Sequence, residues 1–273
     1  MDIKTFEHFA IETAKSAGRV LMSYFGKLTH VDNKSTDIDL VTKADLDAEK
    51  IITQSIQKEF PHHNIIAEES DFHKIDADFC WVIDPLDGTT NFVHTLPIFA
   101  VSIGLQYRNK TILGVVYNPV YDQCFHATLN GGAFLNNSPI NPSSTNTLSE
   151  SLLVTGFPYI HDGMWRESFR LFEDFYSRNQ GMRRLGAAAL DFCFVAMGRF
   201  DGFYEFNLQP WDICAGDLIL REAGGETSDW DGMTTMPFAG NRILASNGYL
   251  QAQMSEVLMQ KKYVDVFFEL EEN

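Results

Sequence analysis

Two aspartates follow an apolar run in the stretch WVIDPLDGTTNFVH, which covers residues 81–94. Asp84 and Asp87 come where a buried strand is expected to end, and Gly88-Thr89-Thr90 follows at once. Asp-Pro and Asp-Gly pairs also begin ordinary turns, so this motif taken alone favours a turn. The residues that follow favour a binding site instead. Their unhindered backbone N–H groups and hydroxyls would hold an anion, next to a cation bound by the two acids.

Two further stretches place acids in a similar position. Pro210 suits the first turn of a helix, so the carboxylate of Asp212 would project from a helix N-terminus, with simple helix capping as the alternative. Glu68 and Glu69 directly follow the apolar run 64–67, with a solvated loop as the alternative. Acids at such ends of buried segments are candidates for one shared site.

Taken together, four acids form a candidate metal site: Glu68, Asp84, Asp87 and Asp212. Carboxylates gathered in one cleft repel and raise one another's pKa values unless a cation is present. No His or Cys stands at ligand spacing, and an all-oxygen set favours Mg²⁺ before Mn²⁺ or Ca²⁺. Two such ions ~4 Å apart bridge a phosphate, stabilise the leaving oxygen and acidify a water. The chemistry expected is hydrolysis of a phosphate ester.

Composition limits the other functions. The 273 residues are 45% hydrophobic and 21% charged, as in a globular chain of one large domain or two lobes. The net charge of −16 and the absence of a basic cluster argue against an extended nucleic-acid partner. No apolar run approaches the ~18 residues of a membrane span, and the N-terminus lacks a signal-peptide layout. Four scattered cysteines without a C-x-x-C pair fit a reducing cytoplasm best.

Hydrophobic periodicity predicts the elements that must position these acids. In the first half we expect helices over 3–24 and 45–59, strands over 64–67 and 79–83, and a meander of hairpins over 98–134. In the second half we expect helices over 163–178, 187–197, from 210 and over 249–260, and strands over 182–185, 203–206, near 226 and near 243. The turn-rich segment 136–151 divides the chain into an N-terminal lobe, 1–145, with an antiparallel sheet, and a C-terminal α/β lobe, 146–262. The tail, 263–273, gives no clear prediction.

Three ordered motifs resemble those of the inositol monophosphatase family. WVIDPLDGTTNFVH resembles its D-P-[IL]-D-G-T-T-N-F signature, and PWDICAGDLILREAGG is similar to its second signature, W-D-x-A-A-G. NKSTDIDLVTKAD and IIAEES are also similar to the family's pattern, so the likeness covers most of residues 3–260. The resemblance implies a mixed α/β fold, a layered α-β-α-β-α sandwich of two lobes.

The same resemblance implies a role for individual residues. The family's metal ligands fall on Glu68, Asp84, the carbonyl of Leu86, Asp87 and Asp212. Its water-activating pair falls on Thr89 and Asp45, its phosphate-binding backbone on Gly88 and Thr89, and its lysine near the metals on Lys34. The substrate-side candidates are Asp87, Ala188, Asp191 and Glu205. A solvated loop charge for Lys34 and a strand-end acid for Glu205 are the plain alternatives.

By resemblance, the chain would be a Mg²⁺-dependent phosphomonoesterase that hydrolyses a small polyol or sugar phosphate, with inositol monophosphate as the first candidate substrate. The resemblance also implies two or three bound Mg²⁺ ions, which Mn²⁺ can replace, and inhibition of the enzyme by Ca²⁺ and Li⁺. It further implies a homodimer. Family members also hydrolyse fructose 1,6-bisphosphate, 3′-phosphoadenosine 5′-phosphate or histidinol phosphate. The alternative of another class is a non-catalytic, metal-stabilised binding or regulatory module. The presence of both Thr89 and Asp45 favours the enzyme, because such a module needs no water-activating pair.

Other hydrolase and kinase chemistry has no motif here, since the chain lacks a G-x-S-x-G elbow and a G-x-x-x-x-G-K-[ST] loop. The chain also departs from the family pattern in places. Ala187 stands where many relatives have Ser or Thr, Leu86 replaces the commoner Ile, and Cys214 replaces Ala. These changes keep the expected metal ligands in place, but the identity of the substrate's leaving group does not follow from the motifs.

Overall fold

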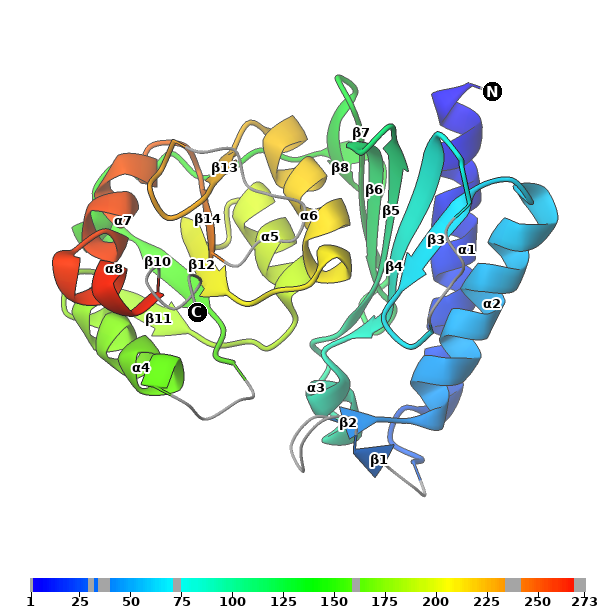
Figure 1. Cartoon of the computed structure of the whole chain (residues 1–273), viewed down its shortest axis with the longest axis horizontal. Helices are drawn as coiled ribbons and strands as arrows, with labels where there is room; N and C mark the ends of the chain where they lie inside the picture. The colour runs from blue at the N-terminus through cyan, green and yellow to red at the C-terminus, as the bar shows by residue number, and fades with distance from the viewer. Residues whose placement is uncertain are drawn as a thin grey trace.

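Helices and sheets alternate in five layers, helix, sheet, helix, sheet and helix (Figure 1). The computed structural model describes residues 2–28, 32–33, 40–70, 75–158, 163–233 and 242–267. The expected mixed α/β sandwich is confirmed. The division into lobes near residue 145 stays a prediction. None of the helices in the described ranges combines the length and the apolar composition needed to cross a bilayer.

The first half of the chain supplies two layers. Helices α1 (Ile3–Tyr24) and α2 (Lys43–Glu59) pack on one face of a seven-stranded sheet. In spatial order the strands are β3 (Asn64–Ala67), β4 (Phe79–Asp87), β5 (Ala100–Tyr107), β6 (Lys110–Asn118), β7 (Gln123–Thr128), β8 (Gly132–Leu135) and β9 (Ser138–Pro139). Only β3 and β4 pair in parallel among these neighbours. The short pair β1 (Asp32–Asn33) and β2 (Leu40–Val41) and the short helix α3 (Thr89–Val93) lie outside these layers.

The second half supplies the other three layers. Its five-stranded sheet has the spatial order β11 (Gly181–Arg183), β10 (Leu152–Thr155), β12 (Gly202–Phe206), β14 (Arg242–Ser246) and β13 (Glu226–Ser228). Helices α5 (Ala188–Ala196) and α6 (Pro210–Ala223) lie between the two sheets. The outer layer holds α4 (Gly163–Tyr176), α7 (Gln251–Leu258) and α8 (Lys261–Phe267), and the 3₁₀ turn η1 (Leu148–Glu150) precedes β10. The predicted helix and strand alternation is therefore present.

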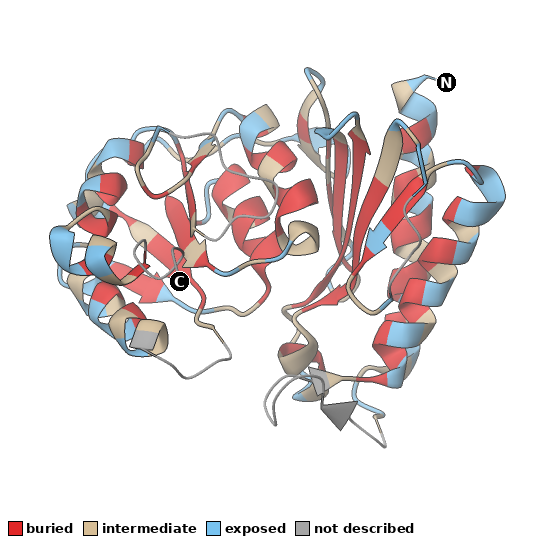
Figure 2. Ribbon diagram, viewed as in Figure 1, coloured by how far each residue is buried: buried red, intermediate tan, exposed pale blue. Residues whose placement is uncertain are grey.

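The central helices are buried on nearly all sides, whereas α1 and α2 are buried only where they face the sheet (Figure 2). Helix α6 lies unusually close to the first sheet, because glycines face it. A Cβ atom at Gly104 would lie 2.4 Å from Cys214 Sγ, and one at Gly114 would lie 2.5 Å from the backbone oxygen of Ala215. Because Gly104 of β5 and Gly114 of β6 have no side chains, these two glycines set the distance between the sheet and the helix that carries Asp212.

Strand β4 is longer than its apolar pattern predicts. We expect a strand that ends at residue 83, but β4 continues to Asp87 with a shift of register between Asp84 and Asp87. Pro85 explains the shift, because it has no N–H to donate to the neighbouring strand. The bulge brings both aspartates to the same end of the strand, and the prediction that Asp84 ends it is wrong.

Helix α8 lies in the segment for which the sequence gives no prediction. Its residues Tyr263 and Phe267 are almost fully buried, and Phe267 contacts the rings of Phe206 and Trp230. Aromatic and β-branched residues have modest helix propensity, so the helix depends on burial rather than on local preference. A periodic pattern over so few residues is too short to detect.

The close approach of α6 gives a test of the fold. We expect Gly114→Ala to lower the free energy of unfolding by about 1–3 kcal/mol, because the new methyl group meets helix backbone that cannot rotate away. Gly181→Ala in β11 is the matched control, since its Cβ meets only side-chain atoms at 3.2 Å or more and should change stability by about 0.5 kcal/mol or less. Urea denaturation of both variants makes the comparison, and equal effects would contradict this account of the interlayer distance.

Candidate active site

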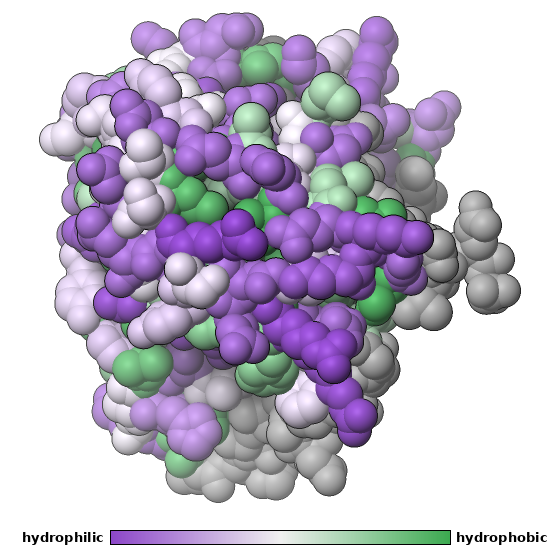
Figure 3. Space-filling model, turned by 90° about the vertical axis from the view of Figure 1, so that its left-hand side faces the viewer, coloured by the Kyte–Doolittle hydropathy of each residue, from purple (hydrophilic) through white to green (hydrophobic). Residues whose placement is uncertain are grey.

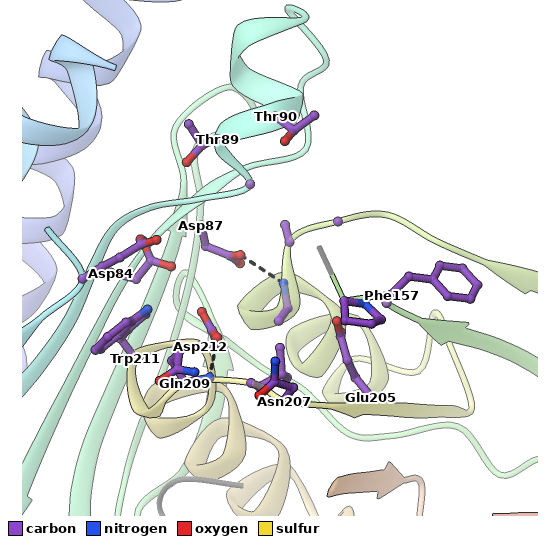
Figure 4. Close-up of a pocket in the computed structure, with 18 of the residues that line it drawn as sticks. Asp84, Asp87, Thr89, Thr90, Phe157, Glu205, Asn207, Gln209, Trp211 and Asp212 are labelled. Atoms are coloured by element: carbon purple, nitrogen blue, oxygen red, sulfur yellow. Dashed lines mark hydrogen bonds between the residues drawn. The ribbon is translucent and has the colours of Figure 1, made fainter. Parts of the chain in front are cut away.

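A cavity of about 410 Å³ lies where β4, α3, α5, β12 and α6 meet (Figure 4). Both halves of the chain contribute to its wall. Its acidic lining residues are Glu68, Asp84, Asp87, Glu205 and Asp212. The four acids that the sequence predicts to converge therefore line one cavity, although they are up to 144 positions apart in the chain.

Asp84 and Leu86 occupy the bulge of β4. Only 2% of Asp84 is exposed, and its Oδ1 accepts a hydrogen bond of 2.9 Å from the backbone N–H of Leu86. The carbonyl of Leu86 accepts a bond of 3.2 Å from the Thr89 hydroxyl. The bulge thus turns a carboxylate and a main-chain carbonyl toward the residues that follow the strand.

Asp87 joins the first sheet to the central helix layer. Its two oxygens accept hydrogen bonds of 3.1 and 2.9 Å from the backbone N–H groups of Ala188 and Ala189, at the start of α5. The partial positive charge of a helix N-terminus favours an ionised carboxylate there. Gly88, with φ of 94°, follows, and a Cβ at this position would lie 2.9 Å from the Ile98 carbonyl oxygen. Only glycine fits this turn without strain.

Thr89 and Asp45 are brought together as the sequence predicts. The Thr89 hydroxyl lies 3.0 Å from Asp45 Oδ1, and Asp45 is fully buried. Asp45 Oδ2 accepts bonds from the N–H and the hydroxyl of Thr42, which cap the start of α2. Burial raises the pKa of Asp45, and these bonds from Thr42 lower it. A capped helix therefore fixes the carboxylate that holds the Thr89 hydroxyl.

Asp212 and Glu205 enter the cavity from the second half. Asp212 is the third residue of α6, and its Oδ2 accepts a 2.7 Å hydrogen bond from the backbone N–H of Gln209. Glu205 lies on β12, and its carboxylate packs against Gly156 so closely that a Cβ there would lie 1.9 Å from Oε1. In Figure 4 Asp212 lies below Asp87, and Glu205 lies farther from Asp84 than Asp212 does.

The remaining predicted positions differ in their placement. Ala188 lines the cavity and binds Asp87 through its N–H, whereas Asp191 is not among the lining residues. Asp191 is 1% exposed, its Oδ1 has no hydrogen-bond partner, and burial, followed by the charge of Glu205, raises its pKa well above the usual value. Ala187 is the residue just before α5, and it also lines the cavity. Lys34 lies outside the described residues.

Sequence reasoning missed several residues of this site. Asn91 ties α3 to the segment before α5, because its side-chain amide donates to the carbonyls of Ile98 and Leu185 at 2.7 and 2.8 Å. Asn91 supports the site from outside the cavity wall, whereas Trp211 and Arg184 line the cavity itself. Asn91 and Trp211 lie inside the motifs quoted above, and this position is the sequence signal that could have identified them. Nothing in the pattern distinguishes Arg184 from a surface arginine.

The acids of the cavity disfavour one another's ionised forms. Burial, and then the charge of Glu68, raises the pKa of Asp84 well above its usual value. Burial raises the pKa of Asp87 to about 7 and that of Glu205 to about 8, although the N–H of Ala189 and the charge of Arg184 oppose these two rises respectively. The pKa of Asp212 is also raised, first by burial. Ionising all of them together requires positive charge from outside the chain.

The donor set fits a hard cation, and three of its carboxylates are hydrogen-bonded to backbone N–H groups. All the candidate donors are oxygens, which are the ligands that Mg²⁺ prefers. Yet of the described residues, no three acidic, histidine or cysteine side chains close around a common point that could hold an ion. Asp84, Asp87 and Asp212 instead direct oxygens to backbone N–H groups. Each carboxylate oxygen that accepts such a bond keeps a further lone pair, so these hydrogen bonds hold the acids in place without using up their capacity to bind a cation.

Sequence relatives carry two kinds of name. A family model described as the inositol monophosphatase family matches residues 2–263. A relative named inositol-1-monophosphatase, from Synechocystis sp., is 43% identical over 94% of this chain and 90% of its own length. A relative named putative Nus factor SuhB, from Neisseria meningitidis serogroup B, is 40% identical over 93% of this chain and 97% of its own.

Solved structures share the whole fold. The extragenic suppressor protein suhB from Bartonella henselae superimposes with a TM-score of 0.89 at 36% identity, covering 94% of this chain and 99% of the other. The inositol monophosphatase from Anabaena (Nostoc) sp. gives 0.84 at 41% identity, covering 95% and 97%. SaIMPase-II with bound 2′-AMP gives 0.82 at 30% identity, covering 98% and 99%. The family match along nearly the whole sequence, together with these relatives, shows that the chain belongs to the inositol monophosphatase family of phosphatases.

Proposed function

We propose that this family member is a Mg²⁺-dependent phosphomonoesterase that releases phosphate from a small polyol phosphate, inositol monophosphate first. The observation that carries the proposal is the shared cavity of four acids distant in sequence, beside the Gly88-Thr89 backbone. Buried acids that repel one another are costly, and a phosphatase that uses cations gives them a purpose. The relative named inositol-1-monophosphatase supports the choice of substrate.

Each residue then has a defined task. The ligands for Mg²⁺ are Glu68, Asp84, the carbonyl of Leu86, Asp87 and Asp212. When bound, Mg²⁺ neutralises the phosphate, stabilises the leaving oxygen and acidifies a water. The Thr89 hydroxyl, which donates to Asp45, keeps its lone pairs available to orient that water. The N–H groups of Gly88 and Thr89 donate hydrogen bonds to phosphate oxygens, and the Glu205 carboxylate accepts a hydrogen bond from a hydroxyl of the leaving group. Lys34 stays a candidate near the metals, and Asp191 one on the substrate side.

The substrate inside this class is the finer question. A structure of SaIMPase-II holds inositol monophosphate and another holds 2′-AMP, so one relative accommodates both a polyol and a nucleotide. Fructose 1,6-bisphosphate, 3′-phosphoadenosine 5′-phosphate and histidinol phosphate complete the panel. Phosphate release from each compound, with Mg²⁺ and with EDTA, tests the proposal. Strong release from the bisphosphonucleotide with none from inositol phosphate would replace our first choice.

Three finer properties go with the proposal. Mn²⁺ should replace Mg²⁺, whereas Li⁺ and Ca²⁺ should inhibit, and the chain should form a homodimer. A second candidate is a binding role in addition to hydrolysis, because relatives at about 40% identity are named Nus factor SuhB. The hydrogen bond between Thr89 and the buried Asp45 favours hydrolysis, since binding alone does not require this pair.

Removing one metal ligand should separate activity from folding. We expect Asp84→Asn to lower Mg²⁺-dependent phosphate release about a hundredfold or more, since one ligand serves the whole metal set. The metal-free variant should melt at a higher temperature than the metal-free parent, because one buried repulsive charge is gone. Added Mg²⁺ should then raise its melting temperature less than that of the parent.

The control for this variant is Asp78→Asn, which removes a half-exposed acid paired with Arg108 on the surface. It should leave phosphate release and the effect of Mg²⁺ on melting as in the parent. An Asp84→Asn protein with parent-like turnover would reject the metal assignment.

The raised pKa values predict how stability depends on pH without metal. Glu205 ionises at about pH 8 in the folded chain, well above the ordinary value of 4.5, so its stabilising effect is complete below about pH 4.5 and lost as pH rises through about 8. In EDTA we expect the unfolding free energy of the parent to fall over this window more steeply than that of Glu205→Gln. Urea titrations at several pH values measure both slopes. Parallel curves would show that Glu205 is not held protonated by the fold.

A further inference from the structure

The cavity has a second end, which the family motifs do not cover. In Figure 4 Phe157 lies beyond Glu205, at the side of the cavity away from Asp84. Phe157 follows Gly156, and the close contact of Gly156 with the Glu205 carboxylate places a hydroxyl acceptor next to an aromatic side chain. The far end therefore combines one charged group and one flat apolar surface.

The Phe157 ring packs against aromatic side chains of α4. It stacks on Phe169 of α4 with 4.6 Å between centroids and 13° between planes. Phe169 in turn makes a T-shaped contact with Trp165, with 5.0 Å between centroids and 75° between planes. Packed rings of this kind are fixed in orientation before a ligand arrives, which lowers the entropy cost of stacking on them.

Core packing does not account for these aromatic residues. The core-facing side of α4 is formed by residues such as Leu171 and Phe175, which are fully buried. Phe169 is 47% exposed and Tyr176 is 58% exposed. The face over α4, α7 and α8 is otherwise mostly hydrophilic, with small separate hydrophobic patches (Figure 3). A large exposed ring next to a ligand cavity costs solubility and indicates a binding use.

We propose that Phe157, supported by Phe169, is a specificity-determining residue that selects phosphate monoesters whose leaving group carries a planar aromatic ring. This inference rests on the proposed function. A polyol would use Glu205 and leave the ring surface empty, whereas a nucleoside phosphorylated on its ribose has hydroxyls for Glu205 and a base for Phe157. A base that stacks on an aromatic side chain gains about fivefold to a hundredfold in affinity.

The reaction on such a substrate is the same hydrolysis. The bond between phosphorus and the ribose oxygen breaks, and the water oxygen forms the new bond to phosphorus. A proton from the water goes to the ribose oxygen, which leaves as the nucleoside hydroxyl. No oxidant, reductant or second substrate is required.

The experiment compares 2′-AMP with inositol 1-phosphate as substrates in the presence of Mg²⁺. We expect Phe157→Leu, which keeps apolar volume but removes the aromatic face, to lower the ratio of kcat/KM for 2′-AMP to that for inositol 1-phosphate at least about fivefold. The change should lie mainly in KM for 2′-AMP, because the ring contacts a part of the substrate that does not react. Tyr176→Leu removes an exposed ring from the C-terminal end of α4, the helix that carries Phe169, and it should leave the ratio unchanged.

Several outcomes would decide against parts of this account. An unchanged ratio in Phe157→Leu, or an equal fall in Tyr176→Leu, would overturn the aromatic subsite. Turnover of inositol 1-phosphate by the parent with none of 2′-AMP would overturn it as well. Hydrolysis of neither compound would instead refute the proposed function. In that case calorimetric titration of 2′-AMP into the parent and Phe157→Leu still tests the subsite, because equal affinities would reject the ring contact.

Discussion

Repulsion among buried carboxylates is the constraint on which this structure depends. Several acids share one cavity, and burial raises the pKa of Asp84, Asp87 and Asp212. The fold tolerates them because helix starts lie next to them. Asp87 binds the first N–H groups of α5, Asp212 accepts an N–H at the start of α6, and Asp45 caps α2. The partial positive charge of these helix N-termini favours the ionised carboxylates, so the acids and the helix starts position each other.

This arrangement also explains the close spacing of the layers. Helix α6 carries Asp212, and it reaches the first sheet only because Gly104 and Gly114 have no side chains. A larger separation would move Asp212 away from Asp84 and Asp87, which belong to that sheet. The distance between the sheet and the central helices is therefore a property of the site as well as of the core. Stability and the geometry of the acids are set by the same contacts.

The sequence predicts the chemistry of this chain better than its geometry. The long periodic pattern of α1 and the alternating strands of the meander are local signals, and both elements are present. The bulge at Pro85 and the burial of Tyr263 in α8 depend on neighbouring strands and helices, so no local pattern reveals them. Asp191 was expected on the substrate side, but helical position alone does not say whether a side chain reaches the cavity or stays behind its wall.

The two ends of the cavity have different relations to the sequence motifs. The acidic end comes from stretches such as DPLDGTTN and PWD, where residue type follows directly from the chemistry. The end near Phe157 comes from a segment without a motif and from α4, where an aromatic residue is equally consistent with a core. Phosphate chemistry requires the same atoms whatever alcohol leaves, so the motifs carry no information about that alcohol. We infer that selection among substrates lies in residues such as Phe157, which a signature does not contain.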